Sequence, residues 1–213
     1  MKKIYFILLA AAAIIIIFVL NNKFDKQDQA IYVAINGDDQ NPGTKSKPFR
    51  TLKKAASEAI AGTTVLIREG KYKEKLVVKH SGTKSNPITF KAYNKEKVIL
   101  SGRDLKDVEG DTSLVTINNK NYVTISGIII QDLSTNLADE TVMGIYVTGS
   151  SNHITLENNN VQRIETNADD GNGHGIAVYG IDTMKNIIIL NNTIEDLIDF
   201  RKKSPILKEY EGR

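Results

Sequence analysis

Residues 121–133 read Asn121-Tyr-Val-Thr-Ile-Ser-Gly-Ile-Ile-Ile-Gln-Asp-Leu133, and the same pattern returns twice further along the chain. It returns as Asn152-His-Ile-Thr-Leu-Glu-Asn-Asn-Asn-Val-Gln-Arg-Ile164 and as Lys185-Asn-Ile-Ile-Ile-Leu-Asn-Asn-Thr-Ile-Glu-Asp-Leu197, at offsets of 31 and 33 residues. A period in this range is typical of stacked units that cannot bury an apolar face alone. Because aliphatic residues keep their places in every copy, we expect Val123, Ile154 and Ile187 to form one interior column.

The composition of the repeat excludes helical solenoids. Ankyrin and tetratricopeptide repeats need two helices per unit, whereas here apolar residues alternate with polar ones and asparagine is frequent. Leucine-rich repeats need a leucine and asparagine frame that is missing. We therefore predict an all-β parallel β-helix, a solenoid with coils over residues 63–197 and strands stacked ~4.8 Å apart. Differences in repeat length are expected in loops at 134–143 and 165–174.

The segment before the coils, residues 31–62, contains a strand and one helix. Ile31-Tyr32-Val33 is β-prone and is closed by turn residues. The helix is expected near Thr51–Ala61, because Leu52, Ala55, Ala56, Ala59 and Ile60 fall on one stripe and Gly62 ends it.

Three further stretches carry a family resemblance. They are Tyr32-Val-Ala-Ile-Asn-Gly-Asp-Asp-Gln-Asn-Pro-Gly-Thr-Lys-Ser-Lys-Pro-Phe-Arg-Thr-Leu52, Thr64-Val-Leu-Ile-Arg-Glu-Gly-Lys-Tyr72 and Ser81-Gly-Thr-Lys-Ser-Asn-Pro-Ile-Thr-Phe90, followed by Ala92-Tyr93. Together they resemble the pectate-lyase-like superfamily of right-handed parallel β-helix proteins, especially those of polysaccharide lyase family 9. The resemblance spans about residues 31–197. It implies that the helix caps the first coil, covering an otherwise open strand edge.

The N-terminus predicts export. Met1-Lys2-Lys3 precedes seventeen uncharged residues, Ile4–Leu20, so residues 1–23 are expected to be a signal peptide or a transmembrane anchor, with residues 24–30 as a tether. No small-x-small cleavage site follows, and the anchor is favoured. The positive-inside rule then places the remainder outside, extracellular or at the cell surface. The absence of cysteine leaves stability to burial and backbone pairing.

The net charge of +3 comes from Lys2, Lys3 and Lys23, because residues 1–23 contain no acid. The remainder carries 25 basic and 25 acidic residues, and this balance argues against a nucleic-acid partner. Residues 198–213 lose the repeat and contain Pro205. We interpret them as a non-repeat tail, with truncation of a longer coil series as a hypothesis.

Asp169 and Asp170 are the candidate metal ligands. Carboxylates beside Asn172 suit Ca²⁺, which binds six to eight oxygens; the alternative is a turn that these residues merely satisfy. The family resemblance implies that calcium neutralises a uronate carboxylate and that a lysine or arginine removes the C5 proton. No lysine or arginine matches that base, which the resemblance implies on a later coil, so the catalytic residue stays unknown.

Other residues are candidates for carbohydrate contact. His174 is one, with a loop-edge histidine as the alternative. Tyr146 and Tyr179 lean outward at comparable positions and offer flat stacking surfaces, as does Tyr122. Asn158–Asn160 and Asn191-Asn192 predict an asparagine stack at a coil corner, with a ligand-binding role as the alternative. Lys71, Lys73, Lys75 and Lys79 predict a solvated strand face.

Two functions therefore stay open. The first is an envelope protein of the polysaccharide lyase type that acts on or binds acidic polysaccharide, weakly active or inactive as it stands. The second is a noncatalytic β-helix that binds glycan or displays a surface.

Overall fold

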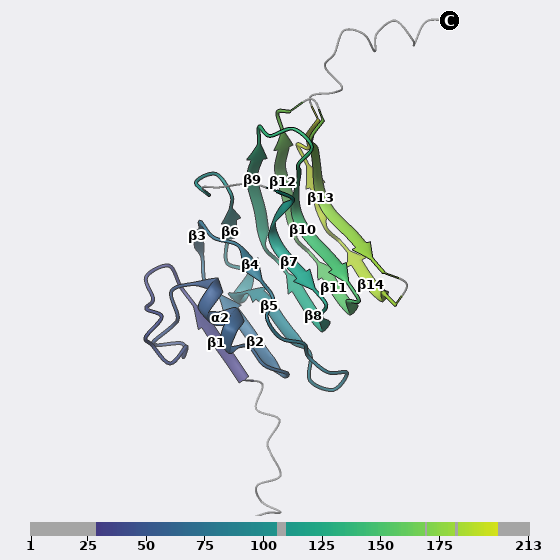
Figure 1. Ribbon diagram of the computed structural model, residues 1–213. Coiled ribbons are helices and arrows are strands. Elements are labelled where there is room, and N and C mark those ends of the chain that lie inside the picture. Colours follow the sequence, from purple (N-terminus) through teal and green to yellow (C-terminus); the bar gives the residue numbers. More distant parts are fainter. Residues whose placement is uncertain (1–28, 106–109, 169, 182, 200–213) are drawn as a thin grey trace, which may run out of the picture.

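A computed structural model of the 213-residue chain describes residues 29–105, 110–168, 170–181 and 183–199. They form a right-handed parallel β-solenoid of about five turns with one short helix (Figure 1). Residues 1–28 and 200–213, which include the expected signal or anchor segment, lie outside the described residues. None of the described helices is long and apolar enough to cross a membrane.

Each complete turn contributes one strand to each of three parallel sheets, which we call sheets A, B and C. Sheet A contains β1 (Gln29–Val33), β2 (Thr63–Ile67), β5 (Ile88–Ala92), β8 (Asn121–Ser126), β11 (Asn152–Glu157) and β14 (Lys185–Leu190). Sheet B contains β3 (Gly70–Tyr72), β6 (Val98–Ser101), β9 (Ile129–Thr135), β12 (Asn160–Thr166) and β15 (Thr193–Glu195), and β16 (Ile198–Asp199) also pairs with β12. Sheet C contains β4 (Leu76–Val77), β7 (Thr112–Asn118), β10 (Thr141–Gly149) and β13 (Asn172–Gly180).

The predicted interior column is confirmed. Ile154 pairs in register with Val123 on one side and Ile187 on the other. In sheet B, Ile164 lies beside Leu133 as the repeat requires. Val123, Ile154, Leu133 and Ile164 are at most 1% exposed, so equivalent aliphatic residues of successive turns fill one continuous core.

The asparagine stack is also confirmed, at the corner between sheets A and B. Asn159 Nδ2 donates to the Ile125 carbonyl over 3.0 Å, and Asn159 Oδ1 accepts from the Ile128 N–H over 3.1 Å. One turn later Asn192 repeats the arrangement: its Oδ1 accepts from the Asn159 N–H and its Nδ2 donates to the Leu156 carbonyl. The side chains satisfy backbone groups that the tight corner leaves unpaired.

The helix α2 (Leu52–Glu58) is shorter than predicted but in the predicted place. It packs against β1 and β4 and buries Leu52, Ala55 and Ala56. Thr51 caps it by accepting from the Lys54 N–H, and the Glu74 carboxylate accepts from the N–H groups of Leu52 and Lys53. The first strand begins at Gln29, within the segment expected to be a tether, because its backbone pairs with β2 from that residue on.

Candidate functional site

A groove of about 330 Å³ lies on sheet C and contains all three residues that the sequence predicted for substrate binding. Its lining residues are Asp111, Thr141, Met143, Tyr146, Asn172, His174 and Tyr179. They come from β7, β10 and β13 or from the residues just before these strands. The groove therefore crosses three successive turns of the solenoid.

Strand register explains why these side chains meet. Strands β10 and β13 pair in parallel, with Met143 opposite His174 and Thr148 opposite Tyr179. The Tyr146 and Tyr179 rings meet edge to face, with centroids 6.4 Å apart and planes at 66°. Tyr179 is 62% exposed, so most of this side chain remains accessible to a ligand.

Two glycines allow sheet C to pass close to sheet B behind this groove. A Cβ on Gly144 would lie 2.3 Å from Val161 Cγ1, and a Cβ on Gly175 would lie 2.5 Å from Ile194 Cγ2. Both distances are far inside van der Waals contact. The pattern Gly-Ile-x-Val, which occurs at residues 144–147 and again at 175–178, thus reflects a close approach of two strands at each of these turns.

His174 lies in a strand rather than at the edge of a loop. Strand β13 begins at Asn172, two residues before His174, and the connection from β12 covers only residues 167–171. The prediction of a longer polar loop was wrong here because pairing with β10 uses backbone groups. Gly173 and Asn172 can make those bonds whatever their side chains.

Sequence reasoning missed two acids at the start of sheet C strands. Asp111 Oδ1 accepts from the Thr141 N–H over 2.8 Å, which links successive turns at the end of the groove. Glu140 Oε1 accepts from the Gly110 N–H over 2.7 Å, while its buried Oε2 has no hydrogen-bond partner among the described residues. Both acids immediately precede a sheet C strand, a positional signal present in the sequence.

The candidate metal ligands are only partly described. Asp170 is exposed at the turn before β13, and Asp169 lies outside the described residues. The Glu140 carbonyl accepts from the Asn172 N–H over 3.0 Å, so Glu140 adjoins the end of this turn. The described residues contain no group of three or more His, Asp or Glu side chains able to hold a metal ion. Calcium binding by Asp169 and Asp170 stays a prediction.

The remaining candidates lie elsewhere. Tyr122 stacks on His153 in sheet A, with ring centroids 4.3 Å apart and planes at 18°. Two of the four lysines that were expected to form a solvated face make ion pairs instead. Lys71 Nζ lies 3.7 Å from Asp132, and Lys73 Nζ lies 2.7 Å from Asp104. Sequence spacing did not reveal their acidic partners, which are on the next turns.

Curated relatives are matched over part of their length. Protein YwoF of Bacillus subtilis, described as uncharacterized, is 50% identical over 167 residues, which is 78% of this chain and 36% of the relative. Pectate lyase PEL9 of Emericella nidulans is 35% identical over 83 residues, which is 38% of this chain and 20% of the lyase. The chain thus spans about a third or less of the length of these relatives.

Solved structures share the fold. Lacto-N-biosidase of glycoside hydrolase family 136 from Eubacterium ramulus superposes with a TM-score of 0.63 at 17% identity, over 83% of this chain and 36% of that one. Pectate lyase Pel9A superposes with a TM-score of 0.56 at 18% identity, over 79% and 40%. Among family descriptions, "Pel9A-like, right handed beta helix region" matches residues 31–203. The chain therefore belongs to the Pel9A-like right-handed β-helix family, within the pectate-lyase-like superfamily.

Proposed function

We propose that the sheet C groove is a binding site for acidic polysaccharide in a β-helix protein of the polysaccharide lyase type. The observation that carries the proposal is the convergence of Tyr146, Tyr179 and His174 on one groove through strand register. Tyrosine rings stack on the apolar faces of sugars, and the His174 imidazole supplies ring nitrogens that can hydrogen-bond to sugar hydroxyls. Family membership and the pectate lyase among the relatives support a uronate-containing ligand.

Cleavage by β-elimination needs a base that removes the C5 proton of a uronate. None of the residues that line the groove is a lysine or arginine, as far as the structure describes the chain. We therefore expect this chain to bind acidic polysaccharide and to cleave it weakly or not at all. Noncatalytic glycan binding is the second candidate function, and the absence of a cationic base from the groove lining favours it.

Calcium is part of the proposal. The donors at this end of the groove are oxygen atoms, the type that Ca²⁺ prefers, and the buried Glu140 Oε2 lacks a partner among the described residues. Asp169 and Asp170 would hold the ion with help from Glu140. When bound, calcium would offset the negative charge of a uronate carboxylate and increase the acidity of the adjacent C–H. The protein would supply the oriented oxygens and the tyrosine surface.

The proposed function includes export of the chain to the cell surface or the exterior. The basic and apolar segment of residues 1–23 supports delivery to the cell surface or the exterior, where acidic polysaccharides are encountered. Both a membrane-anchored and a secreted protein fit this sequence. Fractionation of producing cells, with N-terminal sequencing of the mature chain, separates them.

One experiment separates lyase from binding protein. The purified chain is mixed with polygalacturonate and other uronate polymers, with calcium or with a chelator, while ultraviolet absorbance reports unsaturated products. The same samples are run in native gels that contain each polymer, where binding retards migration. We expect retardation with little or no rise in absorbance. A rapid calcium-dependent rise would establish a lyase, and the absence of both signals across the polymers would contradict the proposal.

A further inference from the structure

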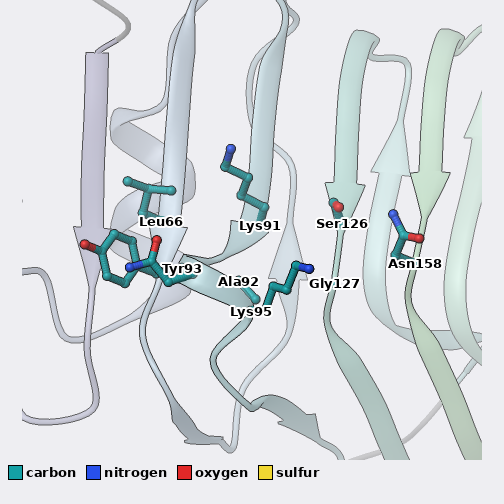
Figure 2. Close-up of a pocket in the computed structure, with 9 residues that line it drawn as sticks. Leu66, Lys91, Ala92, Tyr93, Lys95, Ser126, Gly127 and Asn158 are labelled. Carbon is teal, nitrogen blue, oxygen red and sulfur yellow. The ribbon is translucent and has the colours of Figure 1, made fainter.

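A second groove lies on sheet A, away from the sheet C site. It has a volume of about 870 Å³ and follows the carboxyl ends of strands β2, β5, β8 and β11. Figure 2 shows side chains from these four turns along it, including Leu66, Lys91, Tyr93, Lys95, Ser126 and Asn158. A volume in this range accommodates several sugar units or a molecule of similar size.

An enlarged corner forms one wall of the groove. After β5 the chain takes five residues, 93–97, to reach β6, whereas after β8 and β11 it takes two, 127–128 and 158–159. The longer corner contains a 3₁₀ turn, Tyr93–Lys95, in which Asn94 and Lys95 both have positive φ. The two-residue corners each have one residue of positive φ, Gly127 or Asn158, so the enlarged corner differs in its length and in having two such residues in succession.

Tyr93 is held in place from several sides. Its ring meets that of Tyr32 edge to face, with centroids 5.7 Å apart. The Arg68 guanidinium lies 5.1 Å and the Lys45 ammonium 5.4 Å from the ring centre. Because these contacts already fix the ring, stacking of a ligand on it costs little of the conformational entropy of the Tyr93 side chain.

The groove is cationic at its Tyr93 end. Lys91 and Lys95 are exposed, and neither forms an ion pair within the part of the chain that the structure describes. Arg68, by contrast, is paired with Glu96 at 2.9 Å. The acid on the same row is Glu157, in register with Ser126 and Lys91, and it lies two strands away from the lysines. Negative groups of a ligand would therefore sit near Lys91 and Lys95.

A row of hydroxyls runs beside the groove on the same face. Strand register aligns Thr64, Thr89, Thr124 and Thr155 across four turns. All four are half-buried, and within the described residues none of these hydroxyls makes a side-chain hydrogen bond. Hydroxyls repeated at the strand spacing of ~4.8 Å can donate to and accept from the hydroxyls of a chain laid across the strands.

We propose that this face of sheet A is a second binding site for an anionic glycan. Carboxylates of the glycan would meet Lys91 and Lys95, one sugar ring would stack on Tyr93, and sugar hydroxyls would bond to the threonine row. None of the nine described residues that line the groove is an aspartate or glutamate, so its lining carries no negative side chain to repel an anionic ligand. Two lysines are too few for a phosphate-backbone site, while a fixed aromatic ring beside hydroxyls suits sugar.

The test uses calorimetric titration with a defined oligogalacturonate, a neutral oligosaccharide of equal length and polyglutamate. The full chain carries Lys91→Ala with Lys95→Ala, or Tyr93→Ala, or Tyr93→Phe, and Lys97→Ala is the matched control because Lys97 is exposed in the same corner but does not line the groove. Thermal unfolding checks that each variant is folded. Tyr179→Ala, in the sheet C groove, is measured alongside.

We expect oligogalacturonate to bind at two sites, with the double lysine variant and Tyr93→Ala each weakening one of them at least tenfold. Tyr93→Phe and Lys97→Ala should bind as the parent chain does, and Tyr179→Ala should leave the sheet A site unchanged. Survival of the sheet A site when sheet C binding fails would support this inference while contradicting the proposed function. Equal affinity for polyglutamate, or a double lysine variant that binds like Lys97→Ala, would overturn it.

Discussion

Arg163 donates a hydrogen bond from Nε to Oδ1 of Asp132 over 2.6 Å, and the two residues belong to successive turns of sheet B. The Asp132 side chain is 5% exposed. It also accepts from Gln131 Nε2 over 2.8 Å and has Lys71 and Arg103 within 3.7 Å. One buried carboxylate thus connects side chains from four turns, Lys71, Arg103, Asp132 and Arg163.

Replacing Asp132 with asparagine should lower the free energy of unfolding by about 1–3 kcal/mol, because the buried network loses its negative charge and one of its two acceptor oxygens becomes an NH₂ donor. Asp104→Asn is the control, since Asp104 is half exposed and its one ion pair among the described residues is with Lys73. It should cost less than about 1 kcal/mol. Urea unfolding at neutral pH measures the free energy of unfolding of both variants. Equal losses would show that the contacts of Asp132 contribute no more than one surface ion pair.

The same residue predicts a pH dependence. Burial acts to raise the pKa of Asp132, but hydrogen bonds from Arg163 and Gln131 outweigh it and hold the pKa below its ordinary value of 3.8. Its stabilisation is therefore complete above the unfolded-state pKa and is lost as the pH falls through the folded-state value. Unfolding measured from pH 7 down to about pH 3 should show the advantage of the parent chain over Asp132→Asn shrinking in acid. A constant difference would contradict the assignment.

Asn159→Ala should destabilise the fold by about 3 kcal/mol, since the Ile128 N–H and the Ile125 carbonyl lose their buried partner and each such loss costs about 1–3 kcal/mol. Asn160→Ala, at the next and more exposed position, should cost less than about 1 kcal/mol. Denaturant midpoints compare the pair. Equal losses of stability in Asn159→Ala and Asn160→Ala would show that the asparagine stack does not stabilise the fold.

Tyr179→Ala should weaken binding of a uronate oligomer in the sheet C groove by roughly tenfold, which corresponds to ~1.4 kcal/mol of lost stacking. Tyr179→Phe should keep most of the affinity because it keeps the ring. Ile181→Ala is the control, because Ile181 is as exposed as Tyr179, at 62%, but lies outside the groove. Titration with the oligomer, followed by fluorescence or calorimetry, measures these affinities. A loss of affinity in Ile181→Ala as large as that in Tyr179→Ala would contradict binding in the groove.

Calcium should raise the thermal midpoint of the parent chain, since a ligand at a hundred times its dissociation constant stabilises by ~2.7 kcal/mol. The increase should disappear in Asp169→Asn with Asp170→Asn and shrink in Glu140→Gln. Asp139→Asn is a suitable control because Asp139 is exposed and precedes Asp170 by one repeat. Identical midpoints in calcium and in chelator would remove the metal from the proposal.

The interior of the solenoid was predictable because its buried positions are occupied by aliphatic residues that recur periodically in the sequence. Val123, Ile154 and Ile187 recur at offsets of 31 and 33 residues, and a parallel coil places such residues over one another. The asparagine stack was predictable for the same reason, since the corner between sheets A and B has the same length in both turns.

The groove on sheet C was predictable only in part. Tyr146, Tyr179 and His174 were identified from outward positions on repeated strands, but which of them meet depends on the exact register of β10 and β13. Asp111 and Glu140 were missed because they occupy connections of unequal length, where the repeat gives no alignment. Arg163 and Asp132 occupy the same place in successive copies of the repeat, 31 residues apart, so this contact could have been predicted, whereas Lys71 and Arg103 lie outside the aligned copies.

The three histidines of the chain provide the most direct test of glycan binding on sheet C. His174 lines the groove, His153 stacks on Tyr122 in sheet A, and His80 Nε2 lies 3.2 Å from the Ser57 carbonyl beside the helix. Nuclear magnetic resonance of the three imidazole rings during titration with a uronate oligomer reports on each place separately. We predict a saturable shift of the His174 signals with those of His80 unmoved; an oligomer that binds while the His174 signals stay in place would contradict the account.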